Sequence, residues 1–475
     1  MERLQKIGRI AFRSAAEVRS SRLGIGFEKL DRDLFDPERA YDKVAAIGVK
    51  KIRLQSGWMK TEREKGVYDF AWLDTIVDNL LRRGMEPWLT LCYGNPLYTP
   101  LAVPVFGAVG CPPVGTAEET AAWLRYVEAT VRHFKGRVSL YEIWNEPDAW
   151  YSWRHVEGEE PDLHRNALEY GQFAIATADA IHRADPGARA MGFALGRPVH
   201  LAYVHDALST GMAEHVDCVS YHNYSVQPVQ ADRIAQFTEL VHQFRPDMPI
   251  VQGEGGAQTR STGAGALKGF AWTETRQMTH LLRILLRDLA AGVEFTSYFT
   301  ALDMVEALHG RVDDRASCMD YGYFGVLSAE FDENGRATGE YGKKPSYYAL
   351  SALAALFAGD ARSETLICSR EVLPSRRVDG NDFEGRTLET HGFRLEDGTR
   401  ALAYWNDVPV LTETYDGTVS FTVCCLGQTP PTLIDLRTGD RYALPPEMTE
   451  TLPSGDLLLK NLPLREFPLL LQFGA

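Results

Sequence analysis

Two glutamates that each close a predicted strand are the residues of this chain most able to do chemistry. Glu146 lies in YEIWNEPD (141–148), where an apolar run stops at Asn145, and Glu254 ends the run PIVQGE (249–254). A strand interior tolerates neither a proline nor an unpaired carboxylate, so the first strand must end here. The carboxylate and the amide at its end are therefore candidates for a functional role. A facing carboxyl pair can protonate a leaving oxygen and attack an anomeric carbon, or activate water there, as glycosidic cleavage requires.

The elements that must position these glutamates repeat one pattern from about residue 22. Short apolar runs alternate with stretches of 3.6-residue periodicity, which is typical of parallel strands joined by crossover helices. The strand candidates are 23–28, 51–56, 87–93, 139–144, 188–194, 216–222, 249–254 and 294–300. Eight such units predict an α/β fold, a (β/α)8 TIM barrel, with an open doubly wound sheet as the alternative.

The sequence changes character after residues 343–357. Short strands are then separated by turn pairs, which are Asp397-Gly398, Asp416-Gly417 and Gly439-Asp440. We therefore predict a catalytic barrel over 22–360 and an accessory antiparallel β-sandwich over 361–475, a division that the chain length allows. The segment 1–21 is expected to lend a strand to the sandwich or to pack under the barrel.

Reactive groups of such a barrel lie at the carboxyl ends of its strands. There the sequence places Glu28, Arg53, Tyr93, Asn95, Asn145, Glu146, His222, Tyr224, Glu254 and Tyr298. Beyond the fourth strand, Trp150 and Trp153 are candidate stacking platforms for a sugar, because the faces of pyranose rings expose apolar C–H groups. In a closed barrel the fourth and seventh strands face each other across the mouth, which would bring Glu146 opposite Glu254.

Several stretches give this pattern a family likeness. Asn145-Glu146 after strand four and Glu254 after strand seven resemble the clan A glycoside hydrolases. More narrowly, the chain resembles glycoside hydrolase family 39, the β-xylosidase and α-L-iduronidase family. The stretches that carry this likeness are YDFAWLDTIVDNLLRRGMEPW (68–88), YEIWNEPDAWYSW (141–153), VDCVSYHNY (216–224) and FGVLS with KKPSYYAL (324–350).

The resemblance implies a role for each matching residue. Glu146 would be the general acid/base, Glu254 the nucleophile, and Asn145 the holder of the sugar 2-hydroxyl. Arg53 would keep the nucleophile ionised, and Tyr224 would donate to it. His222 lies two residues before this tyrosine, on the same side of an extended chain.

The chain departs from the family pattern at two strand ends. The nucleophile lies in Gln252-Gly253-Glu254-Gly255-Gly256, whose glycines predict a permissive backbone. Tyr298 and Phe299 stand where a tryptophan is common, so the sugar platform is expected to be rebuilt. The loop 255–272 that follows is a candidate lid. These departures bear on substrate identity more than on reaction type.

Composition excludes several other classes of protein. The net charge is −14 without a block of Lys or Arg, which argues against nucleic acid as a partner. Seven cysteines with no C-x-x-C spacing suggest neither a disulfide framework nor a zinc site. The first 18 residues hold no apolar core, so we expect a cytoplasmic protein that binds no membrane.

The pattern as a whole predicts a retaining, exo-acting β-glycosidase for short oligosaccharides or glycosides, β-xylosidase-like, that needs no metal or cofactor. An α-L-arabinofuranosidase, a β-glucosidase or a β-galactosidase on the same barrel stays open, as does a non-catalytic carbohydrate-binding protein. A dehydrogenase on an open sheet would need nicotinamide. A homo-oligomer is possible, with the terminal domain as its interface.

Overall fold

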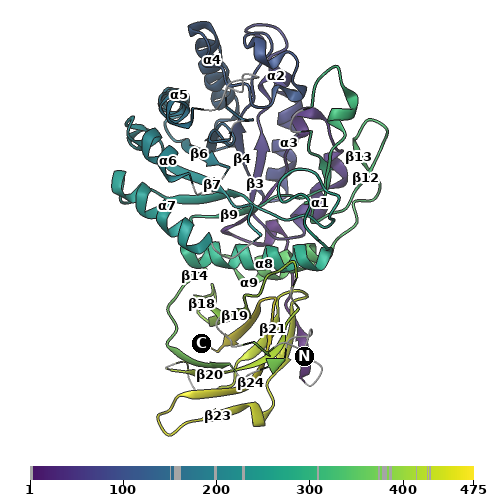
Figure 1. Cartoon of the computed structure of the whole chain (residues 1–475), viewed down its shortest axis with the longest axis vertical. Coiled ribbons are helices and arrows are strands. Elements are labelled where there is room, and N and C mark those ends of the chain that lie inside the picture. The colour runs from purple at the N-terminus through teal and green to yellow at the C-terminus, as the bar shows by residue number, and fades with distance from the viewer. Residues whose placement is uncertain are drawn as a thin grey trace.

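The structure, a computed structural model, describes most of the chain. Outside the described residues lie 1–3, 150, 154–161, 197–199, 227–229, 308–309, 373–374, 377–381, 384–387, 413, 425, 427–428 and 475. Two bodies are visible in Figure 1, a barrel wrapped in helices and a smaller β-domain below it, where both termini lie.

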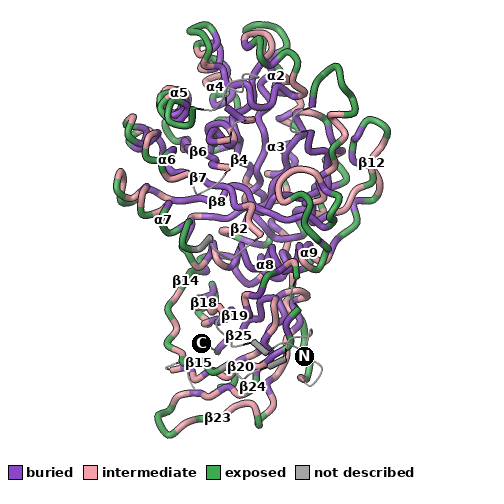
Figure 2. Tube along the Cα trace, in the orientation of Figure 1, coloured by how far each residue is buried: buried purple, intermediate pink, exposed green. Residues whose placement is uncertain are grey.

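Eight parallel strands close into the predicted barrel, in chain order. They are β2 (Leu23–Gly26), β3 (Lys51–Gln55), β4 (Glu86–Leu91), β5 (Leu140–Ile143), β6 (Arg189–Leu195), β7 (Cys218–His222), β8 (Ile250–Glu254) and β9 (Thr296–Tyr298). Nearly every residue of these strands is buried, as Figure 2 shows, because helices cover the outside and side chains fill the inside. The open doubly wound sheet is thereby excluded.

Helices connect the strands and turn one apolar face toward them. The main ones are α3 (Ala71–Arg82), α4 (Ala117–Phe134), α5 (Leu163–Ala184), α6 (Leu201–Leu208), α7 (Gln230–Phe244) and α8 (Glu274–Ala291), with the short α1 (Tyr41–Ala45) and α2 (Trp58–Thr61) before them. Several begin at a residue whose side chain accepts from the backbone of the first turn, as Thr116 does from Glu119. The helix α9 (Pro345–Leu356) follows the barrel and begins with proline.

The β-domain consists of antiparallel sheets. One has the order β1 (Gln5–Arg9), β22 (Asp440–Ala443), β21 (Thr432–Asp435), β25 (Leu469–Phe473), β19 (Arg400–Asn406), β18 (Leu388–Arg394) and β14 (Arg362–Ser363). The other has the order β15 (Cys368–Val372), β20 (Asp416–Val423), β24 (Leu457–Arg465) and β23 (Thr449–Thr451). Along β20 every second residue is buried, because one face packs on the core.

Short hairpins complete the described strands. They are β10 (Met304–Val305) with β11 (Tyr321–Gly322), β12 (Glu330–Phe331) with β13 (Ala337–Thr338), and β16 (Ser375–Arg376) with β17 (Asp382–Phe383). Among the described residues, no helix is both long and apolar enough to cross a membrane.

The β-domain packs against α8, the helix that follows β8. Arg283 of this helix is buried and donates to the backbone carbonyls of Asn406, Val408 and Glu466. Three apolar side chains, Ala257, Trp272 and Val410, form a small cluster between the loop after β8 and the β-domain. The candidate lid is therefore anchored at both of its ends, since it is joined to β8 at one and packed through Trp272 at the other.

Candidate active site

The two predicted catalytic carboxyls face each other at the carboxyl ends of β5 and β8. One carboxylate oxygen of Glu146 and one of Glu254 lie within 4.8 Å of each other. Both residues are largely buried, with 8% and 9% of their surface exposed. The strand order of the closed barrel brings together residues that are far apart in sequence.

The turn that carries Glu146 is strained and held on several sides. Glu146 has a φ of 49° and Trp144 a φ of 70°, in the left-handed region that residues other than glycine rarely adopt. The amide of Glu146 donates to the carbonyl of Ala194 at 2.9 Å, and its carbonyl accepts from the amide of Ala149 at 3.0 Å. Backbone strain of this kind persists where the surroundings fix it, and it concentrates at functional sites.

Arg53 organises the floor of the site. It is 0% exposed, and its Nη1 donates to Glu254 Oε2 at 2.5 Å while its Nη2 donates to Asn145 Oδ1 at 2.8 Å. Burial alone would lower the pKa of Arg53, but the carboxylates of Glu142, Glu28 and Glu254 raise it well above its usual value. The guanidinium therefore stays charged beside the nucleophile candidate.

Glu142 is a site residue that the sequence analysis missed. It lies inside β5, is fully buried, and accepts from Arg53 Nε at 2.9 Å, Thr90 Oγ1 at 2.7 Å and Ser220 Oγ at 2.7 Å. The available signal was a glutamate within an otherwise apolar strand, because a buried carboxylate needs a cation or several donors. Glu142 thus fixes the guanidinium of Arg53 from below.

Replacing Arg53 is expected to destabilise the fold strongly, because the buried carboxylates would lose their counter-charge. For Arg53→Met we expect a loss of about 3–5 kcal/mol in the free energy of unfolding. The loss should be smaller at pH 5 than at pH 8, since the orphaned carboxylates take up protons more readily in acid. Urea unfolding of Arg53→Met at both pH values, with the more exposed Arg83→Met as control, measures this. Equal and small losses in both variants would contradict the role given to Arg53.

His222 and Tyr224 bind the two carboxylates. His222 Nδ1 lies 2.9 Å from Glu146 Oε1 and 3.7 Å from Glu254 Oε2, and the Tyr224 hydroxyl donates to Glu254 Oε1. Burial alone would lower the pKa of His222, but the charges of Glu254 and Glu146 raise it. Burial, with the adjacent Glu254, raises the pKa of Tyr224 well above its usual value, so its phenol keeps the proton it donates.

Glu28 also faces this charge cluster. Its Oε1 lies 3.2 Å from Arg53 Nη1, and the residue is 2% exposed. Burial raises the pKa of Glu28 to about 7, against the opposing effect of Arg53 and with a further rise from Glu254. Glu28 therefore carries a proton in mildly acidic solution, while Glu254 keeps the contact with Arg53.

This raised pKa predicts how stability depends on pH. Between the unfolded value of 4.5 and about 7, folding takes up a proton at Glu28, so its contribution to stability falls as pH rises. In Glu28→Gln this dependence is absent. As pH rises across that window, the free energy of unfolding of the variant should therefore increase relative to that of the wild type, by at most about 3 kcal/mol. Urea unfolding at pH 5 and pH 7.5 tests this, with Glu38→Gln as control. A difference between Glu28→Gln and wild type that stays the same at both pH values would refute the prediction.

Two predicted binding residues take part in the surrounding loop structure. The hydroxyl of Tyr93 accepts from Gln55 Nε2 at 3.3 Å, and its ring lies 5.8 Å from the Arg32 guanidinium carbon. Asn95 donates through Nδ2 to the carbonyl of Glu62 at 2.9 Å and is 1% exposed. Asn95 therefore shapes the loop after β4, and sugar contact remains a prediction for both residues.

Two other predicted residues are buried in the described part of the chain. Trp153 is 1% exposed and packs edge-on against Trp144 with ring centroids 6.0 Å apart, so it is a core residue and not an open sugar platform. Tyr298 is buried, with its hydroxyl 3.4 Å from the carbonyl of Ala257. Trp150 lies outside the described residues.

Aromatic rings lie beside Glu254, the nucleophile candidate, on the β9 side. Phe299 packs edge-on against Tyr224, with centroids 6.1 Å apart, and against Phe324, with centroids 5.3 Å apart. Because Tyr224 donates to Glu254, these rings form an apolar wall beside the nucleophile candidate. Phe299 thus lies where the sequence predicts a changed stacking platform for the sugar.

The glycines around Glu254 are required by close packing. A Cβ at Gly253 would lie 3.1 Å from Glu142 Oε1, and one at Gly256 would lie 2.1 Å from the carbonyl oxygen of Phe299. None of the three glycines from 253 to 256 has the positive φ that would require glycine. The predicted permissive backbone is therefore wrong, and the physical reason for these glycines is room for neighbouring atoms.

The donors around the carboxylates favour acid/base chemistry over metal binding. Glu254 accepts from Arg53 and Tyr224, and Glu146 accepts from Tyr151 and lies 2.9 Å from His222 Nδ1. A divalent cation between these oxygens would lie beside the Arg53 guanidinium and repel it. That the chain works without metal or cofactor remains a prediction.

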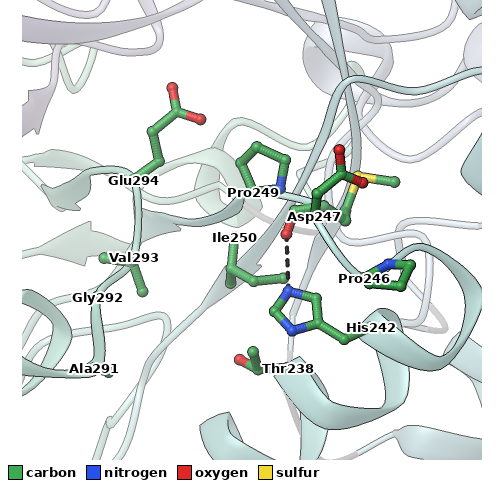
Figure 3. A pocket seen from close by; sticks show the side chains of 11 residues that line it. Thr238, His242, Pro246, Asp247, Pro249, Ile250, Ala291, Gly292, Val293 and Glu294 are labelled. Carbon is green, nitrogen blue, oxygen red and sulfur yellow. Dashed lines mark hydrogen bonds between the residues drawn. The ribbon is translucent and has the colours of Figure 1, made fainter.

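A hollow at the opposite end of the barrel lacks such an arrangement. It measures about 270 Å³, lies at the amino end of β8, and is drawn in Figure 3. His242 there bonds through Nε2 to the carbonyl of Met248 at 3.1 Å. Glu294 pairs with Arg189 at 2.6 Å, and Asp247 with Arg245 at 3.3 Å. Its charged groups are thus used in structural contacts.

Comparisons with known proteins bear on the fold and on one stretch of the sequence. The family model Glyco_hydro_42, β-galactosidase, matches residues 28–96. Over 82 residues the chain is 35% identical to the β-galactosidase BgaA of Clostridium cellulovorans, a stretch that spans 17% of this chain and only 12% of that protein.

Solved structures match over nearly the whole chain. A family 39 glycoside hydrolase from the gut symbiont Bacteroides cellulosilyticus WH2 has a TM-score of 0.63 at 16% identity, covering 96% of this chain and 81% of that one. A monomeric β-xylosidase from Caulobacter crescentus CB15 has a TM-score of 0.59 at 18% identity, covering 98% of both chains. The fold is thus that of these glycoside hydrolases, and the predicted resemblance to clan A and family 39 is confirmed.

Proposed function

We propose that this chain is a retaining exo-glycosidase that removes a terminal β-linked sugar from short oligosaccharides or glycosides. The observation that carries the proposal is the pair of facing carboxyls, Glu146 and Glu254, with oxygens within 4.8 Å of each other and Arg53 bonded to only one of the two. A separation of about 5–5.5 Å between carboxyl groups is typical of retaining enzymes, whereas inverting ones leave about 6.5–9.5 Å for a water molecule.

The two carboxyls are chemically unequal, which assigns their roles. Arg53 and Tyr224 both donate to Glu254, so we assign Glu254 as the group that attacks the anomeric carbon and forms a glycosyl ester. At the same time Glu146 gives its proton to the departing glycosidic oxygen. In the second step Glu146 takes a proton from water, which attacks the anomeric carbon and releases Glu254.

A β-xylosidase is the first substrate assignment and a β-galactosidase the second. The β-xylosidase of Caulobacter crescentus shares the fold over its whole length. The match of residues 28–96 to the β-galactosidase model favours the second, because this stretch contains Glu28 and Arg53. The low exposure of both carboxyls, 8% and 9%, supports attack on a terminal sugar.

A panel of 4-nitrophenyl glycosides, with the first-formed anomer followed by proton NMR, tests the proposal. We expect release of nitrophenol from one β-glycoside, with the sugar first appearing as the β-anomer. No turnover on any glycoside would support the alternative of a carbohydrate-binding protein. A first-formed α-anomer would refute the two-step mechanism.

A further inference from the structure

Tyr151 contacts the acid/base candidate from a side that the mechanism above does not use. Its hydroxyl donates to Glu146 Oε2, while the other oxygen, Oε1, lies 2.9 Å from His222 Nδ1. The same His222 nitrogen lies 3.7 Å from Glu254 Oε2. Oε1 therefore lies on the side of Glu146 where His222 also approaches Glu254, and Oε2 is the oxygen that Tyr151 occupies.

The segment of Tyr151 is clamped onto the turn of Glu146. Ser152 Oγ donates to the carbonyl of Asn145 at 2.5 Å, and Trp144 Nε1 donates to the carbonyl of Ser152 at 2.8 Å. On the other side the backbone of Gly110 lies so close that a Cβ there would be 2.1 Å from the carbonyl oxygen of Tyr151. These contacts fix the backbone that carries the phenol beside the turn of Glu146.

We propose that Tyr151 is a positioning residue for the general acid/base, which holds Oε2 of Glu146 so that the proton leaves from Oε1. This inference rests on the proposed glycosidase function. When the C1–O bond breaks, the proton of Glu146 passes to the departing oxygen, and C1 bonds to Glu254. The new carboxylate of Glu146 keeps the hydrogen bond from Tyr151, which retains its own proton.

The phenol is suited to this task because it does not ionise in the working range. Burial, with the nearby Glu146 charge, raises the pKa of Tyr151 above its usual value. The other charged groups that face Glu146 are His222 from β7, Glu254 from β8, Asp148 on the same loop, and Arg53 through Asn145. A Tyr151→Phe substitution leaves all of these in place.

The test compares kcat/KM against pH for wild type and Tyr151→Phe on phenyl and 2,4-dinitrophenyl glycosides of the sugar found in the panel. Without the hydrogen bond from the phenol, the charged form of Glu146 is less stable. The alkaline limb of the kcat/KM profile should therefore move to higher pH by about 1 pH unit. Activity on the phenyl glycoside should fall about 10-fold, and on the dinitrophenyl glycoside less than about 3-fold, since a good leaving group needs no proton.

The matched control is Tyr98→Phe, which removes a phenol bond of 2.6 Å to another glutamate, Glu62. It should leave the alkaline limb and the ratio of the two activities unchanged. An unmoved alkaline limb in Tyr151→Phe, with equal losses on both substrates, would overturn the proposal while leaving the glycosidase function intact.

If Tyr151→Phe does not fold, Ser152→Ala removes a hydrogen bond that holds the same segment and should change both readouts in the same direction. No change in Ser152→Ala would then overturn the proposal. A wild type inactive on every glycoside would instead refute the function itself.

Discussion

Replacing Glu254 with alanine is expected to lower kcat/KM by at least about 10⁴-fold on every glycoside that the wild-type chain cleaves. Glu254 supplies the atom that bonds to the anomeric carbon, so a better leaving group cannot compensate for its loss. The neighbouring Arg53 would also lose the carboxylate that its Nη1 contacts at 2.5 Å. Steady-state kinetics over the nitrophenyl panel measure the effect.

Azide distinguishes a lost nucleophile from a damaged site. In Glu254→Ala the small anion can enter the space of the missing carboxylate and attack an activated β-glycoside, which gives the α-glycosyl azide. The exposed Glu239→Ala on α7 serves as the control and should keep wild-type rates. Ordinary turnover by Glu254→Ala, or a β-azide from it, would mean that Glu254 is not the nucleophile.

Replacing Glu146 with alanine is expected to give a loss that depends on the substrate. Glycosides with poor leaving groups should lose about 10²–10⁴-fold, because general acid catalysis contributes about that much. Dinitrophenyl glycosides should still form the glycosyl ester at nearly the wild-type rate, after which hydrolysis is slow because no base activates water. A burst of dinitrophenol followed by slow turnover is the expected time course in stopped flow.

Azide should accelerate this second step in Glu146→Ala and give the β-glycosyl azide, since it attacks the ester from the side opposite Glu254. The variant Glu146→Gln keeps the size of the side chain and serves as the matched comparison for packing. Equal losses on good and poor leaving groups would contradict the acid/base role. An α-azide would mean that the two glutamates exchange roles.

The carboxyl pair and the barrel could be predicted because both depend on local signals. Pro147 and the carboxylate of Glu146 end an apolar run, and Glu254 ends another, so each glutamate is marked by where a strand must stop. Eight such runs separated by helical stretches leave few folds other than a closed barrel. The facing arrangement then follows from strand order.

Residues that act across the barrel carried a weaker signal. Glu142 lies in a strand interior, and only its contacts with Arg53, Thr90 and Ser220 from other strands explain its burial. Tyr151 belongs to a loop that returns onto Asn145 and Trp144 through contacts of Ser152. Sequence periodicity indicates on which face of a helix or strand a residue lies, but not which distant side chain it contacts.

In the loop after β5, the sequence predicts an open functional position for Trp153, which the structure buries. Trp153 was predicted to stack on a sugar because it lies beyond a strand end, yet its Nε1 bonds to Glu169 at 3.1 Å and its ring packs in the core. A large aromatic side chain gains most by burial wherever a neighbouring helix offers apolar surface. The ring of Phe299, which the sequence analysis noted only as a departure, lies beside the nucleophile candidate.

The central claim is that Glu254 becomes covalently bonded to the sugar, and trapping this bond tests it most directly. A 2-deoxy-2-fluoro glycoside with a dinitrophenyl leaving group should inactivate the wild type, because the fluorine slows hydrolysis of the ester more than its formation. Peptide mass spectrometry of the inactivated protein is predicted to find one fluoro-sugar, attached at Glu254. A label on another residue, or continued hydrolysis with no label on a chain that cleaves the parent glycoside, would contradict the account.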